Sequence, residues 1–387
     1  MDQDQPLTLH ITTVDLTPWC FLRSWFRCLR EHGYPVVLAC TVTKFRADLE
    51  ASGAEVIDIP IARRISPLQD FISLLKLIRL IRRLRPQLVH THTSKAGFIG
   101  RLAARLCGVP HIVHTVHELP QNAAHSPWLI KFYQYLEKFA AQYLCDHLIT
   151  VSQPNYQQIT SLGIASPEKL TLIREGLDHS KYEPYHRQNA PGQRSAAEIR
   201  AEFAVPDGAP LICSVGRLEE AKGHSDLLRA FQQVSAILPQ ARLVIVGGGH
   251  LQGQLQKELL ELGLQGHAVL AGWRDDMLDI LAACDLYALA SHYEGLGIAT
   301  MEAMALERPV VCTGVGGVLD VVIDGVTGHL APAHNPRAFA EKMLDLLNNP
   351  DKARQFAEAG YRRVQEEFHD DTANKATLAL YREIMSR

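Results

Sequence analysis

Two cations stand five positions apart in a glycine-flanked segment of the chain. Arg217 and Lys222 lie in SVGRLEEAKG, residues 214–223, which leaves an expected strand and enters an expected helix. A planar guanidinium and a point-like ammonium together suit a diphosphate whose negative charge grows during a reaction. The same segment is compatible with an exposed loop that carries two solvated cations.

Two glutamates stand eight positions apart further along the chain. Glu294 and Glu302 lie in SHYEGLGIATMEAMALERPVV, residues 291–311. The two glycines that follow Glu294 permit close backbone approach, and the free amides of the helix that begins next form an anion site. Carboxylates bind sugar hydroxyls but repel phosphate, so the segment favours a ligand that carries both groups. The alternative is that both glutamates are solvated.

Two glycine clusters follow apolar runs in the same half. They are residues 247–249, after LVIV, and residues 313–317, after PVVC. Each is compatible with a tight strand-to-helix turn, because neither is a full dinucleotide-binding fingerprint with its acidic partner.

Histidines cluster in the first half of the chain. The group consists of His90, His92, His111, His114 and His117. If these histidines bound a metal ion, Glu118 is the one acidic residue at a spacing that would let it serve as a further ligand. His117 stands where the apolar run HIVHTVH gives way to a loop, which suits a side chain that faces a ligand cleft. We expect the other histidines to lie in the core or at its rim.

A basic segment precedes these histidines. Residues 61–85 hold seven cations and one acid, and Lys76, Arg79 and Arg83 share one face at helical spacing. A basic amphipathic helix binds anionic lipid headgroups in some proteins, whereas in most it packs on a core and exposes its charged side to water. Peripheral membrane contact through residues 64–85 is therefore one of two interpretations.

The bulk composition limits the class of protein. The chain has 387 residues, 47% of them hydrophobic and 21% charged, with a formal net charge of −3. This length predicts two domains, and the near-neutral balance excludes a generally basic, nucleic-acid-binding surface. The eight scattered cysteines include no Cys-x-x-Cys pair, which predicts reduced core residues and no zinc site. The absence of a basic N-terminal region and of a long apolar run leads us to expect a cytoplasmic protein.

Short apolar runs alternate with amphipathic stretches twice along the chain, which is typical of βαβ units and parallel sheets. The expected domains are residues 1–184, a linker region at 185–210, residues 211–365, and a C-terminal helix at 366–387 that crosses back to the first domain. We therefore expect an α/β protein with two Rossmann-like, doubly wound parallel-sheet domains that face a cleft.

Together these segments resemble the retaining glycosyltransferases of family 4, which have the GT-B fold. In the second half the matching segments are GRLEEAKG, LVIVGGGHL, LAGWRDDMLDILAACDLYALASHYEGLGIATMEAMA and PVVCTGVGGVLDVVIDGVTGHLA. In the first half the match is LVHTHTSKAGFIGRLAARLCGVPHIVHTVHE. The resemblance covers nearly the whole chain and is most specific from residue 211 to residue 332.

The resemblance assigns roles to the residues of the second half. Arg217 and Lys222 would hold the donor diphosphate, Glu302 the ribose hydroxyls, and Glu294 the transferred sugar. The phosphate and sugar contacts would be completed by the backbone amides of Gly295, Leu296, Gly297, Ile298 and Ala299.

Three further residues match places in the family. Trp273 and Arg274 match the nucleobase pocket, and His117 matches the cleft histidine near the reactive carbon of the sugar. The family's frequent Gly-Gly loop after the first strand is missing, because no glycine occurs between Met1 and His32. We therefore expect Trp19, Phe21 and their neighbours to shape the acceptor side.

The resemblance implies transfer of a sugar, with retained anomeric configuration, from a nucleoside diphosphate sugar to a glycan or lipid-linked acceptor. A UDP-sugar is the favoured donor, and HTHTSKAG looks like the branch that makes bacterial capsule and exopolysaccharide. Catalysis would be electrostatic and would need no metal ion or other cofactor. Glu294, His117, Lys222 and Arg217 are the expected catalytic residues.

Two other functions are compatible with the same residues. One is a regulatory subunit that binds a sugar nucleotide without catalysis, although the intact Arg217, Lys222, Glu294 and Glu302 argue against loss of activity. The other is a GT-B sugar-nucleotide epimerase, which would leave the sugar on its nucleotide.

Overall fold

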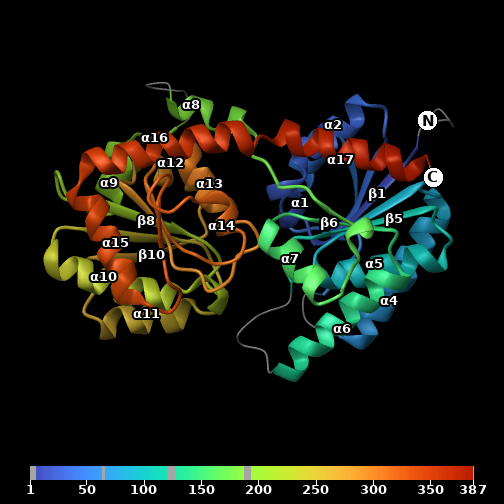
Figure 1. Ribbon diagram of the computed structural model, residues 1–387, viewed down its shortest axis with the longest axis horizontal. Coiled ribbons are helices and arrows are strands. Elements are labelled where there is room, and N and C mark those ends of the chain that lie inside the picture. Colours follow the sequence, from blue (N-terminus) through green and yellow to red (C-terminus); the bar gives the residue numbers. More distant parts are fainter. Residues whose placement is uncertain (1–5, 63–65, 120–126, 187–192, 387) are drawn as a thin grey trace. The chain divides into compact units, whose positions relative to one another are not determined.

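The computed structural model describes residues 6–62, 66–119, 127–186 and 193–386 (Figure 1). These residues form two compact units. Unit 1 contains the described parts of residues 1–176 together with residues 370–386, and unit 2 contains the described parts of residues 177–369. The chain therefore leaves unit 1 after Gly176 and returns to it at Asp370.

Unit 1 is built on a parallel sheet with the strand order β3-β2-β1-β4-β5-β6-β7. Its strands are β1 (Thr8–Val14), β2 (Val36–Thr41), β3 (Ala54–Asp58), β4 (Leu88–His92), β5 (His111–Val116), β6 (His147–Thr150) and β7 (Leu170–Leu172). Its helices are α1 (Leu16–Phe21), α2 (Arg23–Glu31), α3 (Arg46–Ala51), α4 (Pro67–Leu84), α5 (Ser94–Leu106), α6 (Pro127–Tyr143), α7 (Gln153–Ser161) and α17 (Asp370–Met385), with the 3-10 helix η1 (Pro167–Lys169). The strand order reverses between β1 and β4, where ligands of such sheets bind beyond the carboxyl ends of the strands.

Unit 2 repeats this architecture with the strand order β10-β9-β8-β11-β12-β13. Its strands are β8 (Leu211–Val215), β9 (Arg242–Val246), β10 (Ala268–Gly272), β11 (Leu286–Leu289), β12 (Val310–Thr313) and β13 (His329–Ala331). Its α-helices are α8 (Glu183–His186), α9 (Ala196–Glu202), α10 (His224–Ile237), α11 (Gln252–Glu261), α12 (Met277–Ala283), α13 (Ile298–Ala305), α14 (Val318–Val321), α15 (Pro336–Asn348) and α16 (Pro350–Glu367). The 3-10 helices are η2 (His179–Lys181) and η3 (Glu220–Lys222). The order reverses between β8 and β11, the two strands that precede the predicted phosphate-binding segments.

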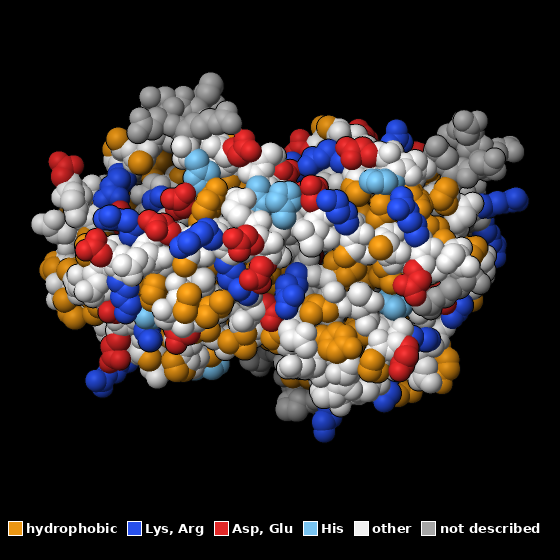
Figure 2. All heavy atoms as spheres, turned by 45° about the horizontal axis from the view of Figure 1, so that its top comes forward, with side chains coloured by type: hydrophobic (Ala, Val, Ile, Leu, Met, Phe, Trp, Pro, Cys, Tyr) orange, Lys and Arg blue, Asp and Glu red, His pale blue; other side chains and the backbone are white. Residues whose placement is uncertain are grey.

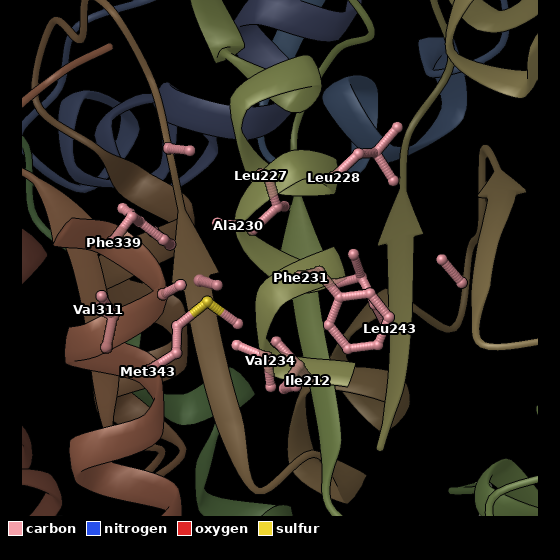
Figure 3. Close-up of a cluster of buried hydrophobic side chains, with 14 of the residues drawn as sticks. Ile212, Leu227, Leu228, Ala230, Phe231, Val234, Leu243, Val311, Phe339 and Met343 are labelled. Carbon is pink, nitrogen blue, oxygen red and sulfur yellow. The ribbon is translucent and has the colours of Figure 1, made fainter. Parts of the chain in front are cut away.

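The core of unit 2 explains why its helices lie as they do. Figure 3 shows apolar side chains of α10 and α15, among them Phe231 and Met343, packed against residues of β8, β9 and β12. These side chains recur every three or four positions along each helix, so one stripe of the helix is buried and the sheet is covered.

Both faces of the sheet in unit 1 are covered as well. On one face, Trp25 and Phe26 of α2 pack with Leu378 and Tyr381 of α17. The other face is covered by α4 and α5. The C-terminal helix α17 is thus part of the core of unit 1.

The observed division of the chain differs from the boundaries drawn from the sequence. The segment from Leu177 to His186 belongs to unit 2, although it was predicted to belong largely to the first domain. Part of the predicted linker is helix α9, because Ser195 and Glu198 form a capping box at its start and Ile199 is buried. Residues 187–192 of that linker lie outside the described residues.

The remaining sequence-based expectations concern membrane segments and cysteines. Among the described residues, no helix is long and apolar enough to cross a membrane. All eight cysteines are free thiols; five of them are buried, as predicted for core residues, whereas Cys20 is exposed and Cys28 and Cys107 are partly exposed. Arg63 and Arg64 of the predicted basic segment lie outside the described residues.

Candidate functional site

Two loops at the carboxyl edge of the unit 2 sheet touch backbone to backbone. The backbone amide of His292 donates to the carbonyl of Ala221 at 2.8 Å, which joins the loop after β11 to η3. Gly223 follows η3 with φ at +59°, and a Cβ atom there would lie 1.9 Å from the carbonyl oxygen of Ala290. Only glycine fits this position, so the predicted Arg217–Lys222 segment is fixed against the loop that carries Glu294.

The two glycine clusters serve the same purpose. In the loop after β9, a Cβ atom at Gly249 would lie 2.3 Å from the carbonyl oxygen of Leu218. In the loop after β12, a Cβ atom at Gly316 would lie 2.0 Å from the carbonyl oxygen of Glu294. The interpretation of these clusters as turns with no other role is therefore incomplete, because their glycines let neighbouring loops approach the predicted site.

Glu294 is held by two side chains. Its Oε1 atom accepts hydrogen bonds from Lys222 Nζ at 2.6 Å and from Ser291 Oγ at 2.7 Å. The residue is only 6% exposed. A carboxylate this deep needs a charged partner, and the ammonium of Lys222 supplies it. The structure thus brings together two of the residues that the sequence singled out from segments about seventy positions apart.

The predicted amide cradle lies at the start of α13. Gly297 precedes the helix with φ at +88°, which turns the chain into its first turn. The amides of Ile298 and Ala299 stand in that turn, where backbone N–H groups have no partner within the helix. Leu296 is buried, and the carbonyl of Gly295 lies against Gly317. The segment therefore presents N–H groups beside Glu294, as a bound anion requires.

Arg217 is the exposed cation of this group. Its side chain is 52% exposed, and Nη1 lies 2.8 Å from a carboxylate oxygen of Glu219. Its carbonyl accepts a hydrogen bond from Nε2 of His224 at 3.1 Å. Burial lowers the pKa of His224 to about 4, so this ring is neutral and holds the loop without adding charge. The backbone of Arg217 is fixed while its guanidinium extends toward solvent.

Glu302 lies on α13 with its side chain partly buried. The hydroxyl of Tyr182 donates to its Oε1 at 3.3 Å. Burial raises the pKa of Glu302 to about 7, although Lys181 and Tyr182 oppose that shift. A further hydrogen-bond donor, such as a ribose hydroxyl, would stabilise the ionised form of this carboxyl group.

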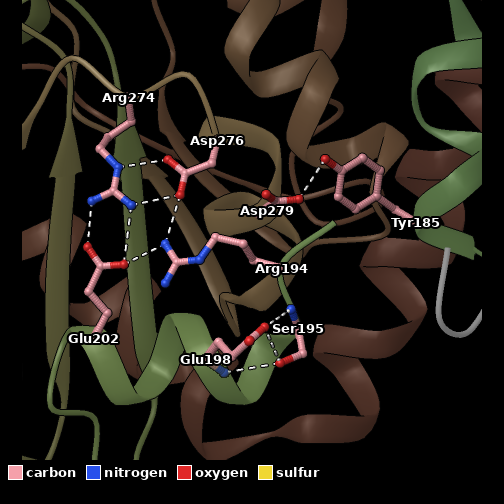
Figure 4. Close-up of polar contacts among 8 residues, drawn as sticks. All are labelled: Tyr185, Arg194, Ser195, Glu198, Glu202, Arg274, Asp276 and Asp279. Atoms are coloured by element: carbon pink, nitrogen blue, oxygen red, sulfur yellow. Dashed lines mark hydrogen bonds and ion pairs between the residues drawn. The ribbon is translucent and has the colours of Figure 1, made fainter. Parts of the chain in front are cut away.

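Arg274 lies in a network of ion pairs (Figure 4). Its guanidinium donates to both carboxylate oxygens of Asp276 at 2.7 Å and to Glu202 of α9 at 2.5 Å. These carboxylates raise the pKa of Arg274 further above its usual range. Arg194 joins the same two acids, so the network fastens α9 to the loop after β10.

The neighbouring Trp273 is 49% exposed, and its indole N–H donates to Asp275 at 3.1 Å. The ring of Trp273 is therefore accessible, whereas the guanidinium of Arg274 forms the ion pairs that hold α9. A nucleobase site at both residues stays a prediction.

His117 lies in unit 1, directly after β5. Its Nδ1 atom lies 2.6 Å from Oε1 of Glu175, and its Nε2 atom lies 3.3 Å from Nδ1 of His92. The ring of Phe21 lies 5.7 Å away, whereas Trp19 stacks on Phe45. Of the two aromatic residues expected to shape the acceptor side, only Phe21 contacts the candidate histidine.

The other histidines of the group are mostly core residues, as expected. His90, His92 and His114 are buried, and His111 is partly exposed. A buried histidine that the sequence did not single out, His10 of β1, brings one nitrogen within 4.8 Å of nitrogens of His90 and His92.

This cluster does not offer three free metal ligands. The two ring nitrogens of His90 lie 2.6 Å from the hydroxyl of Tyr381 and 2.7 Å from that of Thr115.

Two family models match the chain and together span most of it. The glycosyl transferase 4-like domain matches residues 19–176, and the model of glycosyl transferases group 1 matches residues 195–363. Alpha-maltose-1-phosphate synthase of Mycolicibacterium smegmatis is 30% identical over 315 residues, 76% of this chain and 79% of the relative. The chain belongs to the family 4 glycosyltransferases.

Two other relatives of this glycosyltransferase carry cell-envelope names. The UDP-Gal:alpha-D-GlcNAc-diphosphoundecaprenol alpha-1,3-galactosyltransferase of Escherichia coli is 28% identical, covering 84% of this chain and 83% of the relative. The capsular polysaccharide biosynthesis glycosyltransferase CapM of Staphylococcus aureus is 27% identical, covering 80% of each.

Among solved structures, Anabaena HepE in complex with UDP-glucose matches with a TM-score of 0.82 at 21% identity, covering 98% of this chain and all of that one. The sucrose-phosphate synthase of Thermosynechococcus elongatus matches with a TM-score of 0.81, also at 21% identity, covering 99% of this chain and all of that one. These similarities confirm the predicted GT-B architecture of two Rossmann-like domains.

Sequence reasoning missed several residues of the glycosyltransferase that support the candidate site. Ser291 stands three positions before Glu294, and this spacing was a signal that could have been used. Tyr182 and Glu175 lie far along the chain from Glu302 and His117, and no local pattern marks them.

The surface of the glycosyltransferase agrees with the charge balance. Figure 2 shows Lys and Arg side chains interspersed with Asp and Glu over the face that it presents, without a broad region of one sign. On this face, a ligand that carries negative charge would have to be recognised by local groups rather than by a broad basic surface.

Proposed function

We propose that this glycosyltransferase transfers a sugar from a UDP-sugar to a glycan or lipid-linked acceptor, with retention of the anomeric configuration. The observation that carries the proposal is the fixed pair of Lys222 and Glu294 beside the amides that open α13. A UDP donor is supported by the names of the galactosyltransferase relative and of the HepE complex. An acceptor in cell-envelope or exopolysaccharide synthesis is supported by the names of the two bacterial relatives.

In the proposed reaction the donor's diphosphate lies against Lys222, Arg217 and the amides of Ile298 and Ala299. Lys222 has three N–H groups, and one already donates to Glu294, so the others remain for phosphate oxygens. The free carboxylate oxygen of Glu294 accepts from hydroxyls of the transferred sugar. Glu302 accepts from the ribose.

The bond between the anomeric carbon and the diphosphate oxygen breaks, and its electron pair stays on that oxygen. The acceptor hydroxyl oxygen bonds to the same face of the anomeric carbon, and its proton moves to the departing phosphate oxygen. The cations and amides stabilise the charge that develops on the diphosphate, so the proposed step requires no metal ion.

Binding and turnover of donors by the purified protein test the proposal. A thermal-shift series with UDP-glucose, UDP-galactose, UDP-N-acetylglucosamine and GDP-mannose should show stabilisation by a UDP-sugar, because a ligand of the native state raises its apparent stability. The product should be free UDP, by transfer or by slow hydrolysis, in a buffer that contains a metal chelator.

Three results would contradict the proposal. Binding without any release of UDP would indicate a regulatory subunit. A new UDP-sugar formed without acceptor would indicate an epimerase. Loss of activity on chelation would contradict the proposed metal independence.

We further propose that unit 1 docks on an anionic lipid surface, where a lipid-linked acceptor resides. Its helix α6 exposes five aromatic side chains at spacings of three and four, which places them on one face: Trp128, Phe132, Tyr135, Phe139 and Tyr143.

Helix α5 packs against both α6 and α4. Helix α4 exposes apolar side chains before its exposed basic ones: Leu68, Phe71, Ile72 and Leu75, then Lys76, Arg79 and Arg83. Aromatic and basic side chains together suit the interface of an anionic bilayer.

Co-sedimentation with vesicles tests this docking. Phosphatidylcholine vesicles that contain phosphatidylglycerol should bind the protein, and vesicles of phosphatidylcholine alone should bind it less. Reversal of three charges on α4 (Lys76→Glu, Arg79→Glu and Arg83→Glu) should weaken binding at least about 10-fold, since each basic residue near such a surface contributes about 1 kcal/mol.

The matched control reverses three exposed charges of unit 2, Lys257→Glu, Arg337→Glu and Arg354→Glu. Equal binding by the two triple variants would refute docking through α4.

A further inference from the structure

A line of polar contacts runs through unit 1 from a buried histidine to a carboxylate. Nδ1 of His10 lies 3.3 Å from Nε2 of His92, and Nδ1 of His92 lies 3.3 Å from Nε2 of His117. Nδ1 of His117 lies 2.6 Å from Oε1 of Glu175. In every contact, the Nδ1 atom of one ring faces the next member of the line.

The sheet explains how these four side chains meet. His10 on β1 pairs in register with His90 on β4, and His92 is two residues further along, so it lies on the same face. His117 follows β5, the next strand, and Glu175 follows β7. His92, His117 and Glu175 also line a cavity that is bounded by residues of α2 and α17.

The histidines at the inner end of the line are neutral. Burial lowers the pKa of His10 to about 3. Burial, and then the neighbouring histidines, hold the pKa of His92 well below its usual value. A neutral imidazole carries one proton, on one of its two nitrogens, and each of these rings therefore donates one hydrogen bond.

The direction of the line follows from its inner end. Nε2 of His10 is buried and has no hydrogen-bond partner among the described residues, so a proton on that atom would bury an unpaired N–H group. His10 therefore carries its proton on Nδ1 and donates to Nε2 of His92, and His92 in turn donates from Nδ1 to Nε2 of His117. The proton of His117 then stands on Nδ1, which is in close polar contact with Oε1 of Glu175 at 2.6 Å without the geometry of an aligned hydrogen bond.

We propose that His10, His92 and Glu175 are positioning residues that fix His117 in its Nδ1–H tautomer. Nε2 of His117 then accepts from His92, and its Nδ1–H lies beside Glu175 inside unit 1. This proposal rests on the proposed function for its catalytic consequence: His117 is a contact of fixed tautomer rather than a free general base. A reaction in which the leaving phosphate takes the acceptor's proton needs no such base.

The tautomers are measured by long-range proton–nitrogen correlation NMR on the full-length protein with labelled histidines. We expect His10, His92 and His117 all to carry the proton on Nδ1. Glu175→Leu should remove the Nδ1–H form as the main species of His117. His10→Leu should mix the tautomers of His92, and His10→Asn, whose amide nitrogen stands near the position of Nδ1, should restore the wild-type pattern.

His111→Gln is the matched control, because His111 has no contact with the line, and the three histidines should keep their signals. An Nε2–H form of His92 or His117 as the main species in the wild type would overturn the proposal. So would unchanged tautomers in a folded Glu175→Leu variant. If that variant does not fold, the wild-type spectrum decides by itself.

Steady-state kinetics separate positioning from simple structural damage. With the accepted UDP-sugar, Glu175→Leu should lower kcat roughly 10- to 100-fold, by analogy with the loss of a partner that orients a metal-ligating imidazole. KM for the donor should change by less than about 3-fold, because the donor contacts of unit 2 are intact. An unchanged kcat would refute the positioning role. If the protein turns over no UDP-sugar, the proposed function fails while the NMR test still decides the tautomers.

Discussion

The two sheets of this glycosyltransferase share one topology, but the loops at their carboxyl edges are packed in different ways. In unit 2 the loops touch backbone to backbone, because Gly223, Gly249 and Gly316 leave no room for a side chain. That contact places an ammonium and a carboxylate at the edge. In unit 1 the loop after β1 has no glycine, and the edge is filled with aromatic rings and neutral imidazoles. Close backbone packing thus holds charged groups where we propose that the donor diphosphate binds, whereas side-chain packing in unit 1 holds imidazole rings in fixed positions.

The largest expected effect concerns the charged edge. Lys222→Ala should lower turnover of a UDP-sugar about 100- to 1,000-fold, as loss of one group that stabilises developing charge does. Glu294→Ala should lower it to a similar extent, because it removes the proposed sugar contact and the carboxylate that holds Lys222. Turnover is followed by release of UDP, and circular dichroism checks that each variant is folded. Lys257→Ala, on the surface of the same unit, should keep full activity. A folded, active double variant would remove Lys222 and Glu294 from the mechanism.

Glu302 provides a test of buried charge through pH. The pKa of this carboxyl is raised to about 7 in the folded protein, from 4.5 in the unfolded chain. The folded state therefore binds the proton more tightly, and stability from this group is lost as pH rises from about 4.5 to about 7. Glu302→Gln does not ionise, so relative to the wild type it should gain up to about 3 kcal/mol between those limits, at about 1.4 kcal/mol per pKa unit.

Urea unfolding of the wild type and Glu302→Gln at pH 5 and pH 8 measures this difference. Glu341→Gln, on the exposed surface of α15, is the control and should show no such change. An equal difference between Glu302→Gln and the wild type at both pH values would contradict the burial of this charge.

Backbone packing in unit 2 can be tested at adjacent glycines. A Cβ atom at Gly249 meets the Leu218 carbonyl at 2.3 Å, whereas one at Gly248 meets nothing within 4 Å. Gly249→Ala should therefore cost about 1–3 kcal/mol in the free energy of unfolding, the range for overpacking. Gly248→Ala should lie within about 0.5 kcal/mol of the wild type. Equal effects in chemical unfolding would show that loop contact does not limit this position.

The smallest effects compare two buried tyrosines. The hydroxyl of Tyr381 in unit 1 lies 2.6 Å from His90, and the hydroxyl of Tyr287 in unit 2 has no partner among the described residues. Tyr381→Phe should lower the free energy of unfolding by about 1 kcal/mol, and Tyr287→Phe should be neutral or slightly stabilising. The two variants differ from the wild type by the same atom, and a reversed order of stability would contradict these assignments.

Much of the candidate site in unit 2 could be predicted from the sequence, because its residues lie close together in short segments. Arg217 and Lys222 share one loop, and Glu294 directly precedes the glycines and the helix that form the amide cradle.

The support of His117 could not be predicted, for a physical reason. His92 comes from β4, Glu175 from the segment that follows β7, and His10 from β1. Contacts of this kind depend on strand order, which a pattern along the chain does not contain. His10 also occupies a buried position of a strand, as its apolar neighbours do. Nothing in the sequence pattern therefore marks it as a partner of His92.

The place of α17 in the core of unit 1 has a consequence for synthesis on the ribosome. The strands of unit 1 leave the ribosome first, but the helix that covers one face of their sheet is made only after residues 177–369. Unit 2 is continuous and can fold as soon as it has emerged. The first unit to be synthesised is therefore the last to close its core, and until then it exposes an apolar face of the kind that favours aggregation.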